Sequence, residues 1–219
     1  MLLEVDQLTK HYGDVVALSD LHVSLDRGGC VALVGHNGSG KSTAIGCVAG
    51  RLPPTSGRVL VDGSDIVGMR DPVAARRLMS VVPDTAAFYP DLTVREHLEV
   101  VALAHGLGRG TDDAVAAVLD DLGLTERAGQ LPQQLSAGLR QKAQLACGLV
   151  RPFELLVLDE PAPYLDVDAP AWLLARLRRA RDEGVGILLS SHDPAFVGEL
   201  ADEVIELTDG RATPQDGHG

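Results

Sequence analysis

The chain has 219 residues, with 19 Lys and Arg against 31 Asp and Glu, which gives a formal net charge of −12. This length suits one large α/β unit or two small lobes and allows a sizeable hydrophobic core. Binding along nucleic acid or an anionic membrane surface needs clustered Lys and Arg, so the acidic balance argues against both. We therefore expect no nucleic-acid partner.

The three cysteines, Cys30, Cys47 and Cys147, fall inside expected strands or helices and form no CxxC pair. This pattern is typical of cysteines that serve as small core residues in a reducing compartment, and not of metal ligands or a disulfide framework. No apolar run approaches the roughly 20 residues that span a bilayer, and the N-terminal stretch lacks a signal-peptide pattern. The sequence thus predicts a cytosolic chain that reaches a membrane only through a partner.

Short runs of alternating apolar and polar residues fill the first part of the chain. Leu3 and Val5 fall on one face, as do Val23 and Leu25. This period of two predicts an antiparallel sheet. The next apolar run, Cys30–Val34, predicts a buried strand.

Residues 35–43 read GHNGSGKST and fit the phosphate-binding pattern GxxxxGK[ST], called Walker A. A strand precedes this loop and a helix is expected at 43–50, so loop amides and a helix N-terminus converge on the phosphates. Lys41 would supply charge to the β- and γ-phosphates, and the Ser42 hydroxyl is placed to bind Mg²⁺. The expected nucleotide-binding residues are Gly35, His36, Asn37, Gly38, Ser39, Gly40, Lys41, Ser42 and Thr43.

The middle third of the chain, about residues 84–150, has a helical pattern broken by glycines and Pro132. It reads as a helical lobe inserted into an α/β core. Helices are expected at 93–105, 111–122, 136–150, 168–183 and 193–201. Further strands are expected at 57–63, 80–82, 155–159, 185–190 and 203–207.

The predicted fold class is α/β, with a P-loop NTPase core and a mostly parallel sheet. An N-terminal antiparallel β subdomain and an inserted α-helical subdomain complete it. Residues 211–219 form a polar tail that we expect to be disordered.

The strand at 155–159 ends in two carboxylates, Asp159 and Glu160. An apolar run before acids usually means only a strand that meets solvent. Downstream of a Walker A loop, the same pattern indicates a catalytic role, because phosphoryl transfer needs a carboxylate near Mg²⁺ and a group that orients the attacking water. We assign Asp159 to the metal shell and Glu160 to the general base. For His192, at the end of the strand 185–190, we favour a γ-phosphate contact over a structural role.

The stretch LSAGLRQ at 135–141 opens a helix with Ser136 as its N-cap. About 20 residues before the two acids, it resembles the signature motif of the ATP-binding cassette (ABC) family. The resemblance covers nearly the whole chain and rests on five motifs in the family's order. They are an aromatic at Tyr12, Walker A, the signature, the acids of Walker B, and the switch His192.

The resemblance implies that residues 1–219 form one nucleotide-binding cassette that hydrolyses ATP with Mg²⁺. In the family the aromatic at Tyr12 stacks on adenine, although by itself this residue would read as an ordinary surface tyrosine. Two cassettes pair head to tail, so Ser136 and Gly138 of the second cassette would face the γ-phosphate. Asp166 keeps the carboxylate of the D-loop.

The run YPDLTVREHL at 89–98 and the LSxGLRQK form of the signature resemble the ATPase subunits of export-type transporters (ABC-2-like, drug or sodium exporters). Their membrane subunit is a separate chain that docks in the groove beside the loop at 84–97. Departures from the family pattern are Asp84 for glutamine, Ala137 for glycine, Leu139 for glutamine, and Pro163 with Tyr164 in the D-loop. Leu139 fits the subfamily. We expect Asp84 to contact Mg²⁺ through water when the dimer closes, and the alternative is a loop residue that faces solvent.

The leading hypothesis is an ATPase subunit that lies at the inner face of the cell membrane through a permease. A nucleotide-switched regulatory cassette with little activity is one alternative, and a soluble cassette protein of translation or DNA repair is another. Retained Lys41, Glu160 and His192 favour the enzyme. A cassette protein of translation or DNA repair usually has two cassettes in one chain, a coiled-coil insert or a basic surface. The sequence contains none of these. The cargo, its direction and the choice between homodimer and heterodimer stay open.

Overall fold

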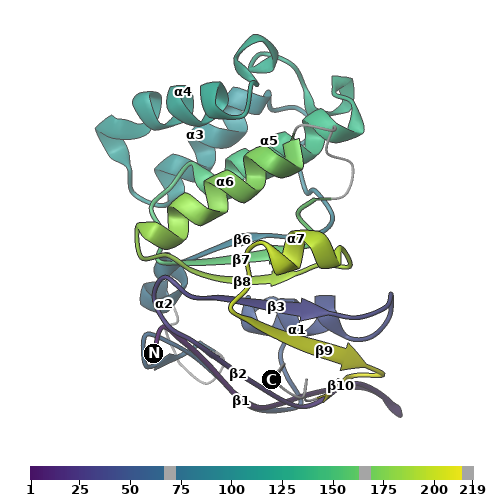
Figure 1. Cartoon of the computed structure of the whole chain (residues 1–219). Helices are drawn as coiled ribbons and strands as arrows, with labels where there is room; N and C mark the ends of the chain where they lie inside the picture. Colours follow the sequence, from purple (N-terminus) through teal and green to yellow (C-terminus); the bar gives the residue numbers. More distant parts are fainter. Residues whose placement is uncertain (67–72, 163–168, 214–219) are drawn as a thin grey trace.

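The computed structural model describes residues 1–66, 73–162 and 169–213. One sheet runs through the described part in the order β5-β4-β1-β2-β10-β9-β3-β8-β7-β6. Helices α3 to α6 cover the parallel strands on one side, and α1 lies between those strands and the β1–β2 layer on the other (Figure 1).

The N-terminal strands are β1 (Leu3–Tyr12), β2 (Val15–Leu25), β4 (Ser56–Val61) and β5 (Ser64–Asp65). They pair antiparallel, with Leu3 opposite Leu25 and Val5 opposite Val23. These four side chains are buried. The predicted antiparallel sheet is confirmed, because the alternating side chains need a common buried face.

The central strands are β3 (Cys30–Val34), β6 (Met79–Val82), β7 (Leu155–Asp159), β8 (Gly186–Ser190) and β9 (Glu203–Thr208). Neighbours among them pair in parallel. Every residue of β7 and β8 is buried, as expected for parallel strands covered on both faces. The register places Ser190 beside Leu33 on one side and Asp159 on the other. The carboxyl ends of β3, β7 and β8 therefore meet at one edge.

The helices are α1 (Lys41–Val48), α2 (Val73–Leu78), α3 (Val94–Ala104), α4 (Thr111–Asp121), α5 (Ala137–Leu149), α6 (Ala169–Asp182) and α7 (Pro194–Gly198). Short 3₁₀ turns lie at Gly108–Gly110, Thr125–Arg127 and Pro132–Gln134. Thr93 and Glu96 form a capping box that starts α3. The predicted helices are confirmed within a few residues at their ends, whereas α2 and β5 had no counterpart in the prediction.

Two hydrophobic clusters make the core. One joins α3 to α6 to the parallel strands and includes Leu98 and Leu156, and the other surrounds α1 and includes Ile45 and Leu33. Within the described ranges, no helix is long and apolar enough to cross a bilayer.

Two of the three cysteines, Cys30 and Cys47, are buried, as predicted. Cys30, Cys47 and Cys147 are free. Burial raises the pKa of the Cys30 and Cys147 thiols to about 12, so both stay protonated at neutral pH.

The predicted disordered tail is wrong at its start. Arg211–Thr213 forms β10, antiparallel to β9, and Arg211 lies beside Ser19 of β2. Its three residues are exposed, so no apolar pattern marked them. Backbone pairing with β9 and β2 holds the segment in the sheet. Residues 214–219 lie outside the described part.

Candidate nucleotide-binding site

The loop between β3 and α1 adopts a backbone that only glycines accept. Gly35, Gly38 and Gly40 have φ of 146°, 85° and 109°. A Cβ on Gly40 would lie 2.6 Å from the Ala17 carbonyl oxygen. No side chain of the described residues caps the N-terminus of α1, so its first-turn N–H groups point at the loop as an anion-binding end.

Lys41 is buried against this loop, with 6% of its side chain exposed. Its Nζ donates to the carbonyl oxygens of Gly35 at 2.7 Å and His36 at 3.2 Å. It also lies 3.6 Å from Glu160 Oε1. The ammonium therefore spans from the loop to the acids at the end of β7.

Asp159 is 3% exposed. Its Oδ1 accepts hydrogen bonds from Ser42 Oγ at 3.2 Å and Ser190 Oγ at 2.6 Å. The same Ser190 Oγ accepts from the backbone N–H of Glu160 at 2.9 Å. The Asp159 carboxylate, at the end of β7, is therefore in contact with both the first turn of α1 and the end of β8.

Glu160 has a φ of +47°, a left-handed conformation that is uncommon for a residue with a side chain. Such outliers gather at functional sites, where surrounding contacts hold them. Here the side chain is 13% exposed, and its Oε2 accepts from His192 Nδ1 at 2.8 Å. The strained residue therefore places its carboxylate between Lys41 and His192.

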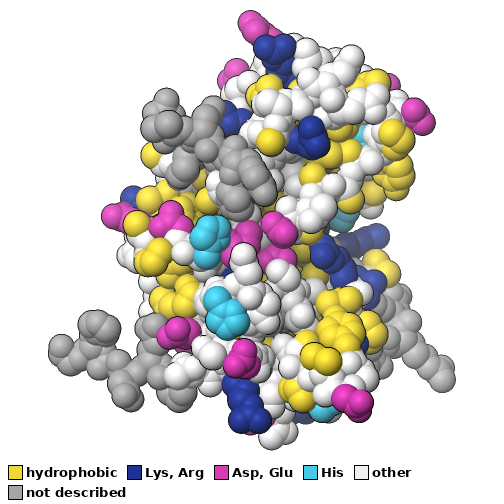
Figure 2. All heavy atoms as spheres, turned by 90° about the vertical axis from the view of Figure 1, so that its right-hand side faces the viewer, with side chains coloured by type: hydrophobic (Ala, Val, Ile, Leu, Met, Phe, Trp, Pro, Cys, Tyr) yellow, Lys and Arg dark blue, Asp and Glu magenta, His cyan; other side chains and the backbone are white. Residues whose placement is uncertain are grey.

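These groups surround a cavity of about 420 Å³, within the range of small-molecule sites. Figure 2 shows histidine and acidic side chains gathered at mid-height on this face of the molecule. The lining residues are Asn37, Gly38, Gly40, Lys41, Ser42, Thr43, Asp84, Glu160 and His192. Burial, followed by the charges of Asp159 and Glu160, raises the pKa of the Asp84 carboxyl.

Other predicted residues lie away from this cavity. Tyr12, at the end of β1, is 49% exposed, and the Lys10 ammonium lies 5.0 Å from its ring centroid. Ser136 caps α5 by accepting from Leu139 N at 3.3 Å, and Gly138 is in the first turn of that helix. Neither Ser136 nor Gly138 is among the lining residues.

Three more of the predicted loop residues surround the cavity without lining it. Gly35 contacts Lys41 through its carbonyl, and His36 Nδ1 lies 2.9 Å from the Asn37 oxygen. Ser39 is fully buried, and its hydroxyl has no hydrogen-bond partner among the residues that the structure describes. Asp166, Pro163 and Tyr164 lie outside the described residues.

Ser190 is the residue that sequence reasoning did not single out. It stood inside a predicted strand and belonged to no motif. Only its position at the end of that strand, level with Asp159, was a signal. The register makes the contact, because strand neighbours are set by pairing and not by sequence spacing.

A parallel sheet, a glycine loop and a buried lysine at the strand ends define a P-loop nucleoside triphosphatase. A family model described as "ABC transporter" matches residues 18–163. The chain belongs to the ABC transporter family, and it is an ATP-binding ATPase subunit of that family.

Named relatives agree. The chain is 35% identical over 211 residues to the SkfA peptide export ATP-binding protein SkfE of Bacillus subtilis, covering 96% of this chain and 87% of that protein. It is 32% identical over 210 residues to the ABC-type transporter ATP-binding protein EcsA of Bacillus subtilis, covering 95% and 84%.

Solved structures share the fold. An ATP-binding subunit of an ABC transporter superposes with a TM-score of 0.90 at 34% identity, covering 98% of this chain and 89% of that one. A dimeric cassette, MJ0796, described in a post-hydrolysis state with ADP and Pi, superposes with a TM-score of 0.89 at 23% identity, covering 99% and 100%. The predicted fold class and ATPase activity are confirmed.

Proposed function

We propose that this chain powers an export transporter by closing on ATP in a head-to-tail dimer and hydrolysing it. The observation that carries the proposal is the contact chain Lys41–Glu160–His192 beside the glycine loop. It puts a cation, a carboxylate and an imidazole on one cavity. These are the groups that phosphoryl transfer to water requires.

In this proposal Lys41 exchanges its bonds to the loop carbonyls for the β- and γ-phosphate oxygens. Glu160 Oε accepts a proton from the attacking water as the oxygen bonds to the γ-phosphorus. The bond from the γ-phosphorus to the ADP oxygen breaks, and its electron pair leaves with ADP. His192, already bound to Glu160 Oε2, holds that carboxylate toward the cavity.

The residues present fit a Mg²⁺ ion. Ser42 Oγ and Asp159 Oδ1 are adjacent, and Asp84 lines the same cavity. Within the described ranges, no three His, Cys, Asp or Glu side chains group as an ion site. That agrees with Mg²⁺, which takes a few protein oxygens together with phosphate oxygens and water. When bound, the ion would neutralise charge on the phosphates.

The position of α5 in the chain supports the proposed dimer. The N-terminus of α5, with Ser136 and Gly138, does not line the cavity of its own chain. In a head-to-tail pair this helix end of the second cassette would supply amides and the Ser136 hydroxyl to the γ-phosphate. Tyr12 would stack on adenine.

A separate membrane-spanning subunit, with this chain at the cytoplasmic face of the membrane, completes the proposal. Export is favoured because the chain is 35% identical to SkfE, a protein named for peptide export, and covers 87% of it. The residues 84–97 are the proposed docking region.

The test is purification of the chain together with any multi-span membrane protein that is encoded beside it. We expect a stable complex whose ATPase activity is lost in Glu160→Gln, with Glu126→Gln as an exposed control. A chain that hydrolyses ATP but forms no complex with any such membrane protein would contradict the transport part of the proposal.

A further inference from the structure

The Tyr12 ring has a cation against one of its faces. Lys10 and Tyr12 stand two residues apart on β1, so both side chains leave the same face of the strand. Lys10 Nζ lies over the ring, 5.0 Å from its centroid. A cation at this distance is attracted to the negative face of an aromatic ring. The contact therefore favours one orientation of a ring that is half exposed and could still receive a second planar group.

Lys10 is itself held from its other side. Its Nζ donates a 2.7 Å hydrogen bond to the Pro53 carbonyl oxygen. An ammonium has three N–H donors, and this bond uses one of them. Because the carbonyl is neutral, the bond fixes the position of the ammonium without cancelling its charge. The full positive charge thus remains available to the ring.

The segment that carries Pro53 connects α1 to β4 and is bound to β1 by backbone groups. Thr55 N donates to the Thr9 carbonyl oxygen at 2.8 Å, and His11 N donates to Thr55 Oγ1 at 2.9 Å. These two bonds flank the position of Lys10 along β1. The Pro53 carbonyl is therefore held beside the lysine by the backbone, and not by the lysine alone.

The same segment is also tied to α1. The N–H groups of Arg51 and Leu52 donate to the Gly46 carbonyl oxygen at 2.9 and 3.0 Å. Since α1 begins directly after the glycine loop, the segment is a fixed extension of the helix that starts at that loop. Lys10 therefore joins the Tyr12 ring to the far end of this helix.

The hairpin that carries Tyr12 also lies against the glycine loop. The register between β1 and β2 skips Ala17, which is the extra residue of a β-bulge. A Cβ on Gly40 would lie 2.6 Å from the carbonyl oxygen of this bulged residue. The backbone of the hairpin thus has a fixed place beside the loop, and the contact with Lys10 decides how the ring stands on it.

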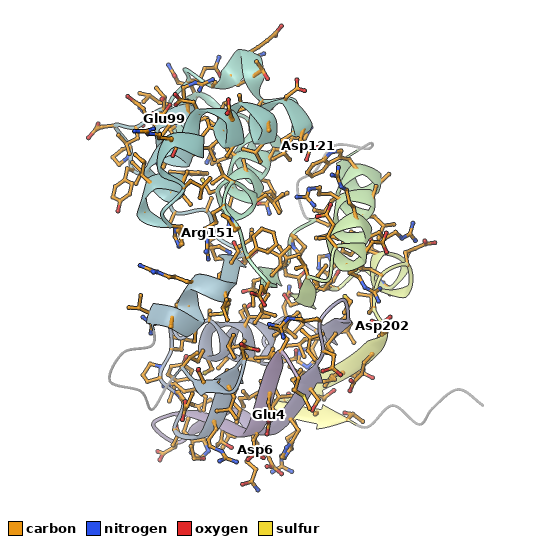
Figure 3. All side chains as sticks on the ribbon, turned by 90° about the vertical axis from the view of Figure 1, so that its left-hand side faces the viewer. Glu4, Asp6, Glu99, Asp121, Arg151 and Asp202 are labelled. Atoms are coloured by element: carbon orange, nitrogen blue, oxygen red, sulfur yellow. The ribbon has the colours of Figure 1, made fainter. Side chains whose placement is uncertain are left out.

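This arrangement is confined to one part of the molecule. Figure 3 shows β1, marked by Glu4 and Asp6, in the lower part of the view, and Glu99 of α3 in the upper part. In Figure 1, α1 lies in the same lower part as β1 and β2. Neither the helical lobe nor a second chain is needed to set the ring.

We propose that Lys10 is a positioning residue for the base of ATP, which acts by holding the Tyr12 ring ready to stack and not by contact with the nucleotide. The inference rests on the adenine contact of Tyr12 in the proposed function. A ring that is ordered before binding loses less conformational entropy when the base stacks on it. Loss of Lys10 should therefore weaken binding of the base and leave binding of the phosphates unchanged.

The contact between Lys10 and the ring is tested first, without nucleotide. The chain has only three lysines, so isotope-labelled lysine gives a simple NMR spectrum, and Lys10→Met identifies the Lys10 signal by removing it. We expect the ring current of Tyr12 to shift the Lys10 ε-CH₂ signal upfield. The signal should return to its ordinary position in Tyr12→Leu. An ordinary position in the wild-type chain would overturn the proposal.

Binding is measured next by calorimetric titration with ADP, which is not hydrolysed, and with pyrophosphate, which has no base, at one Mg²⁺ concentration. Lys10→Met keeps the length of the side chain but removes the cation and the donor. We expect it to raise Kd for ADP about threefold, the range of one exposed cation–π contact. Kd for pyrophosphate should not change. Lys10→Arg keeps a cation and should restore ADP binding, and the exposed control Arg127→Met should bind ADP as the wild-type chain does.

A double-mutant cycle shows whether Lys10 acts through the ring. In a Tyr12→Ala background, Lys10→Met should have no further effect on ADP binding, because no ring is left to position. An effect of equal size on ADP and pyrophosphate would mean that Lys10 acts by its charge or by general stability, and would overturn the proposal. An effect that persists without the ring, or no effect of Lys10→Met at all, would also overturn it.

The same titrations separate this inference from the proposed function. If Tyr12→Ala weakens ADP binding and Lys10→Met does not, the adenine contact stands and the role of Lys10 fails. If Tyr12→Ala leaves ADP binding unchanged, the proposed adenine contact fails, and the role of Lys10 fails with it. The transport part of the proposed function is tested by the complex with a membrane protein, which these titrations do not use.

Discussion

Ser190 Oγ donates a 2.6 Å hydrogen bond to Asp159 Oδ1 and accepts a 2.9 Å bond from the N–H of Glu160. One fully buried hydroxyl on β8 therefore holds both acids at the end of β7. Because Glu160 has a strained φ of +47°, this bond is part of what keeps its carboxylate in the cavity.

Ser190→Ala should lower kcat about tenfold and stability by about 1–3 kcal/mol, because a buried donor and acceptor are lost together. ATP affinity should change little, since Ser190 does not line the cavity. Steady-state phosphate release and thermal unfolding measure the two effects, with the exposed Ser24→Ala as control. An unchanged kcat would show that Ser190 contributes to packing and not to hydrolysis.

Lys41→Ala should abolish ATP binding in equilibrium titration. Apart from His192, Lys41 is the only basic side chain among the described residues that line the cavity. Arg127→Ala removes an exposed positive charge elsewhere and should bind ATP normally. Tight binding by the Lys41 variant would rule out this loop as the nucleotide site.

Glu160→Gln should slow hydrolysis about 10²-fold or more, because the amide keeps the shape but accepts no proton. The variant should also accumulate an ATP-bound dimer, measured by light scattering with and without Mg·ATP. A monomer under all conditions, in the presence of the membrane subunit as well, would contradict the head-to-tail arrangement.

Asp84→Ala should reduce turnover at saturating Mg·ATP while leaving ATP affinity nearly unchanged. The carboxylate lines the cavity near Asp159 and Glu160, and a carboxylate is a normal hard ligand for Mg²⁺. Asp84→Gln should keep or raise turnover. Equal rates for the three forms, assayed with the membrane partner, would leave Asp84 without a role in hydrolysis.

Tyr12→Ala should raise KM for ATP about tenfold with kcat unchanged, since base stacking on an aromatic ring contributes about 1–3 kcal/mol. Tyr12→Phe keeps the ring and should behave as wild type. The ring is half exposed, so the substitution should not affect folding. A change in kcat, or no change in KM, would argue against the adenine contact.

Local motifs made much of the site predictable. Neighbouring residues in the sequence define the loop at 35–43, the acids after β7 and the cap at Ser136, because glycine conformations, strand ends and helix caps are local properties. Parallel pairing then predicts that the strand ends meet at one edge. The α/β fold with its antiparallel N-terminal sheet followed from apolar periodicity in the same way.

Contacts between distant segments needed the tertiary structure. The sequence by itself determined which residue types stand at the loop, strand ends and helix caps. Only the fold decided that Ser190 bonds Asp159, that Lys41 reaches Glu160, and that the exposed residues 211–213 join the sheet. The physical reason is that register, packing and hydrogen-bond satisfaction are set between segments far apart in sequence, where no local pattern records them.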